Sequence, residues 1–169
     1  MDNQQVTDLE LGWLAGAIDG EGCVGVTRRN RKAKLGFTLK PHLQITNCDK
    51  AFIDRCTTTL KLMEIPFWVS YYEGRGRRKS AYTVVIAGLK RCAVALPKLV
   101  PHLTGQKLVK AKLVERWVTS RLADWHAAPF TAEQLAIYEQ LRQMNERGVK
   151  ARNLNDYTRS NRSSKFPNG

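Results

Sequence analysis

Two carboxylates, Asp19 and Glu21, stand one glycine apart at the end of the apolar segment LGWLAGAIDGEG. Thr7 and Glu10 form a capping-box pattern, which predicts a helix from about Asp8 through this segment. Acids at a helix C-terminus oppose the macrodipole, at a cost of about 0.3–1 kcal/mol. A bound Mg²⁺ would offset that cost, because it takes carboxylate and carbonyl oxygens together with waters and substrate phosphate. Taken alone, such a pair is more often an ordinary cap or salt-bridge group.

A glycine stripe runs along the same predicted helix, at Gly12, Gly16 and Gly20. Residues four apart share one ridge of a helix, so this ridge lacks side chains. Each glycine costs about 1 kcal/mol relative to alanine in a helix. Close approach of a partner helix would offset that cost. The alternative is that the stripe faces the chain's own sheet or solvent.

The charge of the chain points to a polyanionic partner. The 169 residues carry 28 Lys and Arg against 15 Asp and Glu, a net charge of +13. No acid occurs in residues 22–48 or in residues 74–114, which suggests a face built against phosphates. Nucleic acid is the first expectation and an anionic membrane the second. A ribosomal or merely basic protein is the remaining alternative.

Cysteine usage and hydropathy predict the environment of the protein. The four cysteines show no metal-ligand spacing, so we expect reduced thiols in an intracellular protein. The polar N-terminus does not resemble a signal peptide, and no apolar run reaches the roughly 18 residues that span a bilayer. We therefore expect a soluble protein in the prokaryotic cytoplasm, an organelle or the nucleus, with neither membrane nor small-molecule partners.

The order of predicted elements repeats one unit, a helix followed by two strands. Strands are predicted over about 23–29, 37–47, 66–73 and 80–87, and Asp49 caps a helix between the pairs. A helix over 89–100 should break near Pro97, and an amphipathic helix follows over 105–125. Thr131 and Gln134 open a last helix that ends near residue 147. The prediction is an α+β fold, αββαββα, with a four-stranded antiparallel sheet forming a DNA-binding saddle, plus C-terminal helices. Residues 1–148 form one domain, and 149–169 form a basic tail that is disordered or contacts DNA.

The strand FTLKPHLQITN, residues 37–47, has two faces of different chemistry. Apolar Phe37, Leu39, Leu43 and Ile45 share one face. Pro41 removes one ladder donor, which predicts a bulge or an edge position. The other face holds Thr38, Lys40, His42, Gln44 and Thr46. This mixture of donors and acceptors suits hydrogen bonding to base edges in a major groove. An ordinary solvated face is the alternative.

Neighbouring strands and their connecting loops extend this candidate DNA-binding surface. On the sheet we place Cys23, Gly25, Thr27, Arg29, Ser70, Tyr72 and Thr83. At the two hairpin tips we place the phosphate-binding cations Arg28, Arg31, Lys32, Lys34, Arg75, Arg77, Arg78 and Lys79. At about 3.3 Å per residue, the 37–47 strand spans about 36 Å, close to one turn of B-DNA. One subunit would therefore read about 10 base pairs.

The nine residues LAGAIDGEG, Leu14 to Gly22, resemble the signature of the LAGLIDADG homing endonucleases, of the single-motif homodimeric type. The sequence departs from that signature at three positions, with Ala17 for Leu, Gly20 for Ala and Glu21 for Asp. The predicted element order agrees with the family over about residues 7–147. The resemblance implies a symmetric homodimer that cuts double-stranded DNA at a long pseudo-palindromic site, with one active site per subunit.

The resemblance also implies roles for individual residues. Glu21 would bind the metal at the scissile phosphate and act in catalysis, and the carbonyl of Gly20 would join it. The metal would be Mg²⁺, with Mn²⁺ or Ca²⁺ able to substitute in binding. By context, Asn47 would order water and Lys107, beside Gln106, would be the active-site lysine; an ordinary solvated lysine is the alternative. The subunit interface would contain Gly12, Leu14, Ala15, Gly16 and Asp19.

A second class of function remains open on the same fold. Glu21 reaches one methylene further than Asp, and a displacement of about 1 Å in an active site can cost about 100-fold in rate. A non-cleaving RNA maturase or DNA-binding regulator is therefore the alternative to the endonuclease. A ribosomal RNA-binding protein would account for the charge but not for the glycine stripe.

Overall fold

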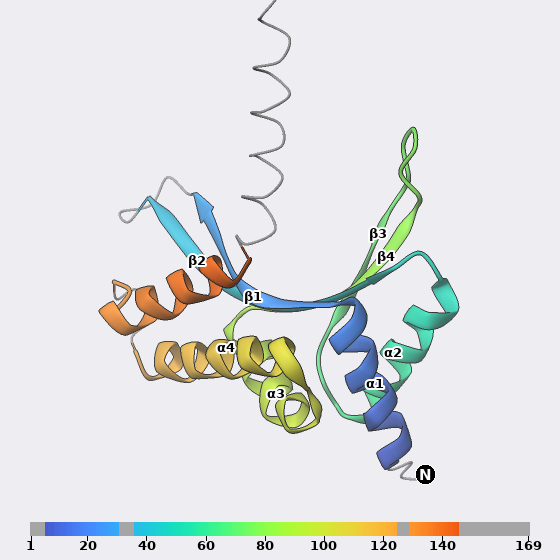
Figure 1. The fold of residues 1–169 in the computed structure, drawn as a ribbon, viewed down its shortest axis with the longest axis horizontal. Coiled ribbons are helices and arrows are strands. Elements are labelled where there is room, and N and C mark those ends of the chain that lie inside the picture. The colour runs from blue at the N-terminus through green and yellow to red at the C-terminus, as the bar shows by residue number, and fades with distance from the viewer. Residues whose placement is uncertain (1–5, 31–35, 125–128, 146–169) are drawn as a thin grey trace, which may run out of the picture.

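The computed structural model describes residues 6–30, 36–124 and 129–145, and its fold is drawn in Figure 1. The elements are α1 (Asp8–Glu21), β1 (Gly22–Asn30), β2 (Phe37–Asn47), α2 (Lys50–Leu62), β3 (Trp68–Tyr72), β4 (Ala81–Ala87), α3 (Leu89–Leu99), η1 (Val100–His102) and α4 (Gly105–Ala123). The chain is again helical over 132–145. The predicted α+β class and element order are confirmed. The predicted tail and the end of the last helix lie outside the described residues.

Helix α1 passes directly into β1, and Gly22 makes this junction possible. The predicted capping box is present at the start of α1, where Thr7 and Glu10 bond each other reciprocally. At the other end the Gly22 N–H donates to the carbonyl of Ile18. A Cβ on Gly22 would lie 2.4 Å from that oxygen, closer than any side chain allows. Only glycine can therefore end this helix and start the strand at once.

The four strands form one antiparallel sheet in the order β1-β2-β4-β3. The pairing of β1 with β2 is continuous from Gly22 opposite Ile45 to Asn30 opposite Phe37, without a bulge. Pro41 pairs with Val26 on the β1 side, and its carbonyl accepts from Gly88 N on the other side. Since β4 ends at Ala87, β2 is locally an edge there, and the missing donor of Pro41 costs no ladder bond.

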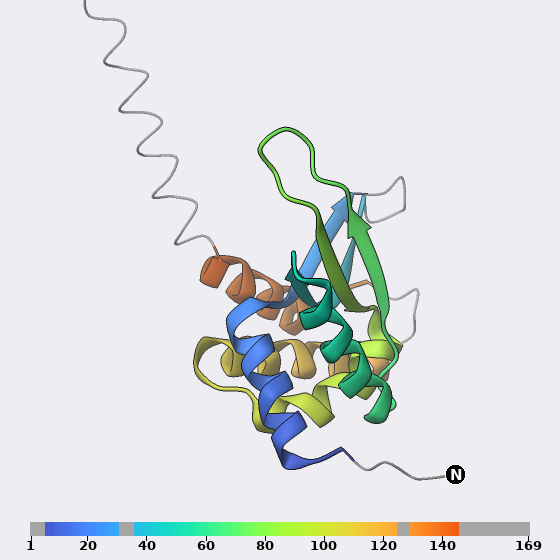
Figure 2. The ribbon, with the colours of Figure 1, turned by 90° about the vertical axis from the view of Figure 1, so that its right-hand side faces the viewer.

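Helices cover one side of the sheet and leave the other side open, as predicted. Figure 1 shows the helices below a curved sheet whose two hairpins rise at either end, and Figure 2 shows the same saddle from its side. The apolar residues of β2 predicted for one face, Leu39, Leu43 and Ile45, are buried against the helices. Leu14 and Ile18 of α1 join them in one core. Among the described residues, no helix is both long and apolar enough to cross a bilayer.

The C-terminal helices differ from prediction in one respect. Helix α3 continues through Pro97 and gives way to η1 only after Leu99. Pro97 stands in the last turn, so its missing N–H removes a single hydrogen bond, and Val100 N–H still reaches the carbonyl of Leu96. The predicted capping box of Thr131 and Gln134 is present at the start of the last helix.

We predict that Gly22→Ala destabilises the protein by about 1–3 kcal/mol, the usual cost of forced overpacking, because the new methyl group meets the Ile18 carbonyl. Denaturant unfolding followed by circular dichroism measures the change. Gly25→Ala is the matched control on β1, since its Cβ would meet only the flexible His42 ring at 3.4 Å. Equal stability of the two variants would contradict the steric argument.

Candidate active site and nucleic-acid interface

The two acids at the end of α1 have different surroundings. The Asp19 carboxylate accepts hydrogen bonds from Thr104 N at 3.1 and 3.3 Å and from Thr104 Oγ1 at 2.6 Å. Thr104 is the N-cap of α4 and makes no side-chain cap bond of its own. Asp19 therefore satisfies the first turn of α4 and fixes it against α1. These bonds lie within one chain, and the predicted place of Asp19 in a subunit interface stays a prediction.

Glu21 is exposed and has no hydrogen bond or ion pair with any residue that the structure describes. Gly20 is also exposed, and its carbonyl lies in the last turn of α1, where helices leave acceptors unsatisfied. Within the described ranges no three His, Cys, Asp or Glu side chains converge into a closed metal site. Mg²⁺ is usually held by one or two carboxylates and completed by waters and phosphate oxygens. Glu21 and Gly20 fit a cation of that kind, shared with a bound phosphate.

The N-terminal turn of α4 lies beside these oxygens. The Lys107 ammonium is partly buried and donates to the carbonyl of Gly22. Together with the Asp19–Thr104 bonds, this contact links the end of α1 to α4 twice. The structure thus brings Lys107 to the end of the motif, and a purely solvated lysine does not describe it. Gln106 beside it is exposed.

Asn47 lies at the same end of the sheet as Glu21. The register pairs Gly22 with Ile45, two residues before the end of β2 at Asn47. The Asn47 Oδ1 atom accepts from Asp49 N at 2.8 Å, and Asp49 caps α2. The side-chain oxygen of Asn47 therefore holds a turn, which leaves its amide NH₂ as the group that can meet a water or phosphate.

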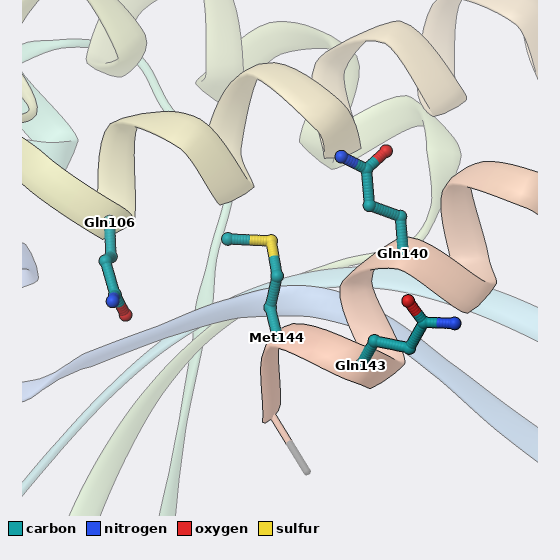
Figure 3. Close-up of a pocket in the computed structure, with 4 residues that line it drawn as sticks. All are labelled: Gln106, Gln140, Gln143 and Met144. Carbon is teal, nitrogen blue, oxygen red and sulfur yellow. The ribbon is translucent and has the colours of Figure 1, made fainter. Parts of the chain in front are cut away.

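A hollow of about 430 Å³ opens next to this site, between α4 and the helix over 132–145. Figure 3 shows Gln106 on α4 and, on the last helix, Met144 extending toward it, with Gln140 and Gln143 completing the lining. Lys110 Nζ donates to Asn145 Oδ1 at 2.6 Å between the same two helices. The described lining consists of amides and a thioether, which neither donate nor accept a proton near pH 7. The ionisable groups suited to catalysis are therefore those at the end of α1.

The open face of the sheet presents the predicted polar residues in cross-strand rows. His42 lies over Gly25 of β1, with Thr27 Oγ1 at 3.1 Å from Nδ1 and Cys23 Sγ at 3.8 Å from Nε2. Thr46 and Thr83 pair across β2 and β4 with their hydroxyl oxygens 2.9 Å apart. Burial is the largest influence on the pKa of His42 and lowers it; a hydrogen bond to the Lys40 backbone raises this pKa, and the nearby charge of Lys40 lowers it further. A neutral imidazole offers one donor and one acceptor to a base edge.

The structure also corrects and extends the predicted surface. Arg28 points to the helix side of the sheet, where its guanidinium lies 4.3 Å from the Phe37 ring centroid. Three predicted cations, Arg31, Lys32 and Lys34, fall outside the described residues. Those of the β3–β4 loop, Arg75, Arg77, Arg78 and Lys79, are exposed. Trp68 was not predicted, although it alternates with Ser70 and Tyr72 and so shares their face of the sheet.

The glycine stripe of α1 is open along its length. Gly12, Gly16 and Gly20 are exposed, and a Cβ on any of them would meet no atom within 4 Å. Leu9, at the start of the same helix, is 79% exposed. Leu14 and Ala15, predicted for a subunit interface, are instead buried in the chain's own core. The stripe thus does not face the sheet of its own chain.

Similar proteins were found by comparing structures, but not by comparing sequences. No protein-family model matches the sequence, and no curated protein matches it. Solved structures that match include the intron-encoded homing endonuclease I-CeuI complexed with DNA, at 16% identity over 83% of this chain and 69% of that one, with a TM-score of 0.65. The LAGLIDADG homing endonuclease I-LtrWI bound to target DNA matches at 25% identity over 82% and 44%, with a TM-score of 0.60. The homing endonuclease I-CvuI, in complex with DNA in the presence of Mg, matches at 22% over 80% and 94%, with a TM-score of 0.53.

The chain has the LAGLIDADG homing endonuclease fold. In this fold the motif residues Leu14–Gly22 make up the second half of α1 and its junction with β1. The place of each motif residue in the fold then explains its residue type. Leu14 and Ile18 face the core, Asp19 holds α4, and Gly22 starts β1. Glu21 is the motif side chain that this scaffold leaves available for a ligand.

We predict that Asp19→Ala destabilises the protein by about 2 kcal/mol, because bonds to a charged acceptor contribute about 1.5–3 kcal/mol and Thr104 N–H loses its partner. Denaturant unfolding measures the loss, and amide exchange in residues 104–107 should accelerate. Asp19→Asn keeps one acceptor oxygen and should lose about half as much. Unchanged stability and exchange in Asp19→Ala would show that the bonds do not hold α4.

Proposed function

We propose that the protein is a site-specific DNA endonuclease that makes double-strand breaks as a homodimer. The observation that carries the proposal is Glu21, an exposed carboxylate that has no hydrogen bond or ion pair among the described residues and lies where α1 of a LAGLIDADG fold enters the sheet. The three matching structures described above are named as homing endonucleases and contain DNA. The net charge of +13 and the polar open face of the sheet suit the same substrate.

The proposed reaction is hydrolysis of a phosphodiester bond. Water attacks phosphorus, the bond to the 3′-oxygen breaks, and that oxygen leaves with a proton. Glu21 and the Gly20 carbonyl would hold a divalent cation, Mg²⁺ first, with Mn²⁺ or Ca²⁺ substituting in binding. When bound, such an ion lowers the pKa of its water and stabilises the departing oxygen. Lys107 would place positive charge beside the phosphate, and the Asn47 amide would orient the attacking water.

The proposed dimer follows from having one Glu21 per chain. Cutting two strands needs two such carboxylates, and a two-fold axis supplies them from identical chains. The exposed Gly12, Gly16 and Gly20 would let two copies of α1 approach closely and bring both Glu21 residues near the axis. The chain covers 94% of I-CvuI but 44% of I-LtrWI, which fits one copy of a unit that longer chains contain with further structure.

Recognition of a long site would use the open face of the sheet. Strand β2 has 11 residues, so each subunit can follow about one turn of B-DNA. His42, Gln44 and Thr46 would meet base edges, while the cations of the hairpin loops would bind phosphates. A two-fold dimer then favours a pseudo-palindromic target.

A second candidate function is DNA or RNA binding without cleavage, as a regulator or a maturase. The observation in its favour is that Glu21 replaces the Asp of the family signature and reaches further. The same surface would bind DNA or RNA, and the residues at the end of α1 would not cleave it. Cleavage assays separate the two functions directly.

We predict that Glu21→Gln lowers cleavage at least about 100-fold and leaves DNA binding within about two-fold, because the variant loses a metal ligand but no contact of the sheet. The substrate is the uninterrupted allele of the DNA into which the gene is inserted, incubated with Mg²⁺. Glu64→Gln, an exposed glutamate at the end of α2, is the matched control. Equal cleavage by both variants would remove Glu21 from the site, and wild-type binding without cleavage would favour the second candidate.

We predict that Gly16→Leu converts the dimer to monomers and abolishes double-strand cleavage. The folded chain has room for the side chain, so the variant should keep its fold and thermal stability. Sedimentation velocity measures the mass, with circular dichroism as the check of folding. Ala136→Leu adds a similar side chain to an exposed position of the last helix and should leave the mass unchanged. A Gly16→Leu protein that remains dimeric would place the interface elsewhere.

A further inference from the structure

A tryptophan with two cations over its ring lies at the edge of the sheet formed by β3. The Arg91 guanidinium carbon is 5.1 Å from the ring centroid of Trp68, and Lys40 Nζ is 5.7 Å from it. The three residues come from α3, β3 and β2, which are distant in the sequence. Trp68 remains 38% exposed, so the cluster lies at the surface.

The register places this cluster on the open side of the sheet. Trp68 pairs with Val85, and Val85 pairs with Gln44, so all three point to the face that carries His42. Lys40 alternates with His42 on the same face and lies beyond the end of β4 at Ala87. Lys40 can therefore reach Trp68 past β4, and Arg91 arrives from the first turn of α3. The cluster continues the polar rows to the β3 edge of the sheet, and β3 and β4 form the hairpin that rises above α1 in Figure 1.

The cluster has an unbalanced positive charge. Neither Lys40 nor Arg91 has a carboxylate within ion-pair distance in the part of the chain that the structure describes. Lys90 adds a further exposed cation beside Arg91. Two like charges held on one ring repel each other, and an anion bound between or beside them would relieve the repulsion. Cation–π contacts also restrict long side chains that would otherwise lose entropy on binding a ligand.

The arrangement suits a phosphate of a nucleic-acid backbone. A guanidinium stacked on an aromatic ring keeps its N–H groups at its rim, where they can donate two parallel bonds to phosphate oxygens. The proposal assigns these donors to the backbone, which carries no base sequence. If the cations served only to cover Trp68, one cation would suffice. Acidic residues could then also lie nearby.

We propose that Arg91, Lys40 and Trp68 form a phosphate-binding site for duplex DNA at the β3 edge of the sheet. This proposal rests on the proposed function and adds α3 to the surface that binds DNA. The site would contact the DNA backbone along this edge and would bind it independently of sequence.

The test measures the salt dependence of DNA binding by the full chain. The probe is a fluorescein-labelled 40-base-pair duplex of arbitrary sequence, titrated at several KCl concentrations without divalent ions. A protein that contacts phosphates gives a linear plot of log K against log salt, and each lost contact reduces the slope by about 0.9. We expect Arg91→Gln to reduce the slope by about 0.9 and to bind several-fold more weakly in low salt. Arg91→Lys should retain most of the slope.

The control is Lys61→Gln, which removes the same charge from an exposed position on α2, a helix that lies on the covered side of the sheet. Its slope should stay within about 0.3 of the wild-type slope, because it removes no direct contact. Circular dichroism checks that each variant is folded, and Trp68→Phe tests the ring while it preserves both charges. If Arg91→Gln and Lys61→Gln give equal slopes, the site is overturned although the protein binds DNA. Wild-type protein without measurable DNA binding would instead overturn the proposed function. A slope change seen only with a matching RNA duplex would assign the site to RNA and overturn the proposal as stated.

Discussion

The hydrogen bonds between Asp19 and Thr104 connect the two parts of the molecule on which the rest depends. They attach the N-terminus of α4 to the C-terminus of α1, and Lys107 repeats the connection through the Gly22 carbonyl. This joint fixes the first turn of α4 against the end of the motif. The acid that opposes the dipole of α1 simultaneously favours the dipole of α4, so its unfavourable position in one helix is offset by the other.

The joint also explains why neighbouring acids can differ in function. Asp19 and Glu21 are two residues apart, which on a helix turns them to different sides. Asp19 faces α4, and its carboxylate is used to hold α4 through the bonds from Thr104. The other side is exposed, at the start of the strand whose open face carries Cys23 and Thr27. A carboxylate at the C-terminus of a helix, with no partner among the described residues, is a position that stability alone does not favour, and this contrast is the physical support for a role in function.

The sequence predicted much of this structure because its signals are local. Capping boxes at Thr7 and Thr131 and the alternation of β2 depend on residues a few positions apart. The pairings of β1 with β2 and of β3 with β4 follow from hairpins, whereas the pairing of β2 with β4 joins strands that α2 and β3 separate in the sequence. Tertiary contacts of this kind could not be predicted. Asp19 finds a partner 85 positions away, and Leu14 and Ala15 are used by the chain's own core. Trp68 was accessible to the same alternation rule, but its link to Arg91 depends on how α3 leaves the sheet.

Because each chain supplies one Glu21, the activity of the proposed dimer depends on the concentration of the protein. A complete pair of sites exists only after two chains have met, so the amount of active species follows mass action. Below the dissociation constant of the dimer, that amount varies with the square of the chain concentration. Halving the supply of protein then reduces active dimers about four-fold. A nuclease assembled in this way is restrained at low expression by its own stoichiometry, without any inhibitor.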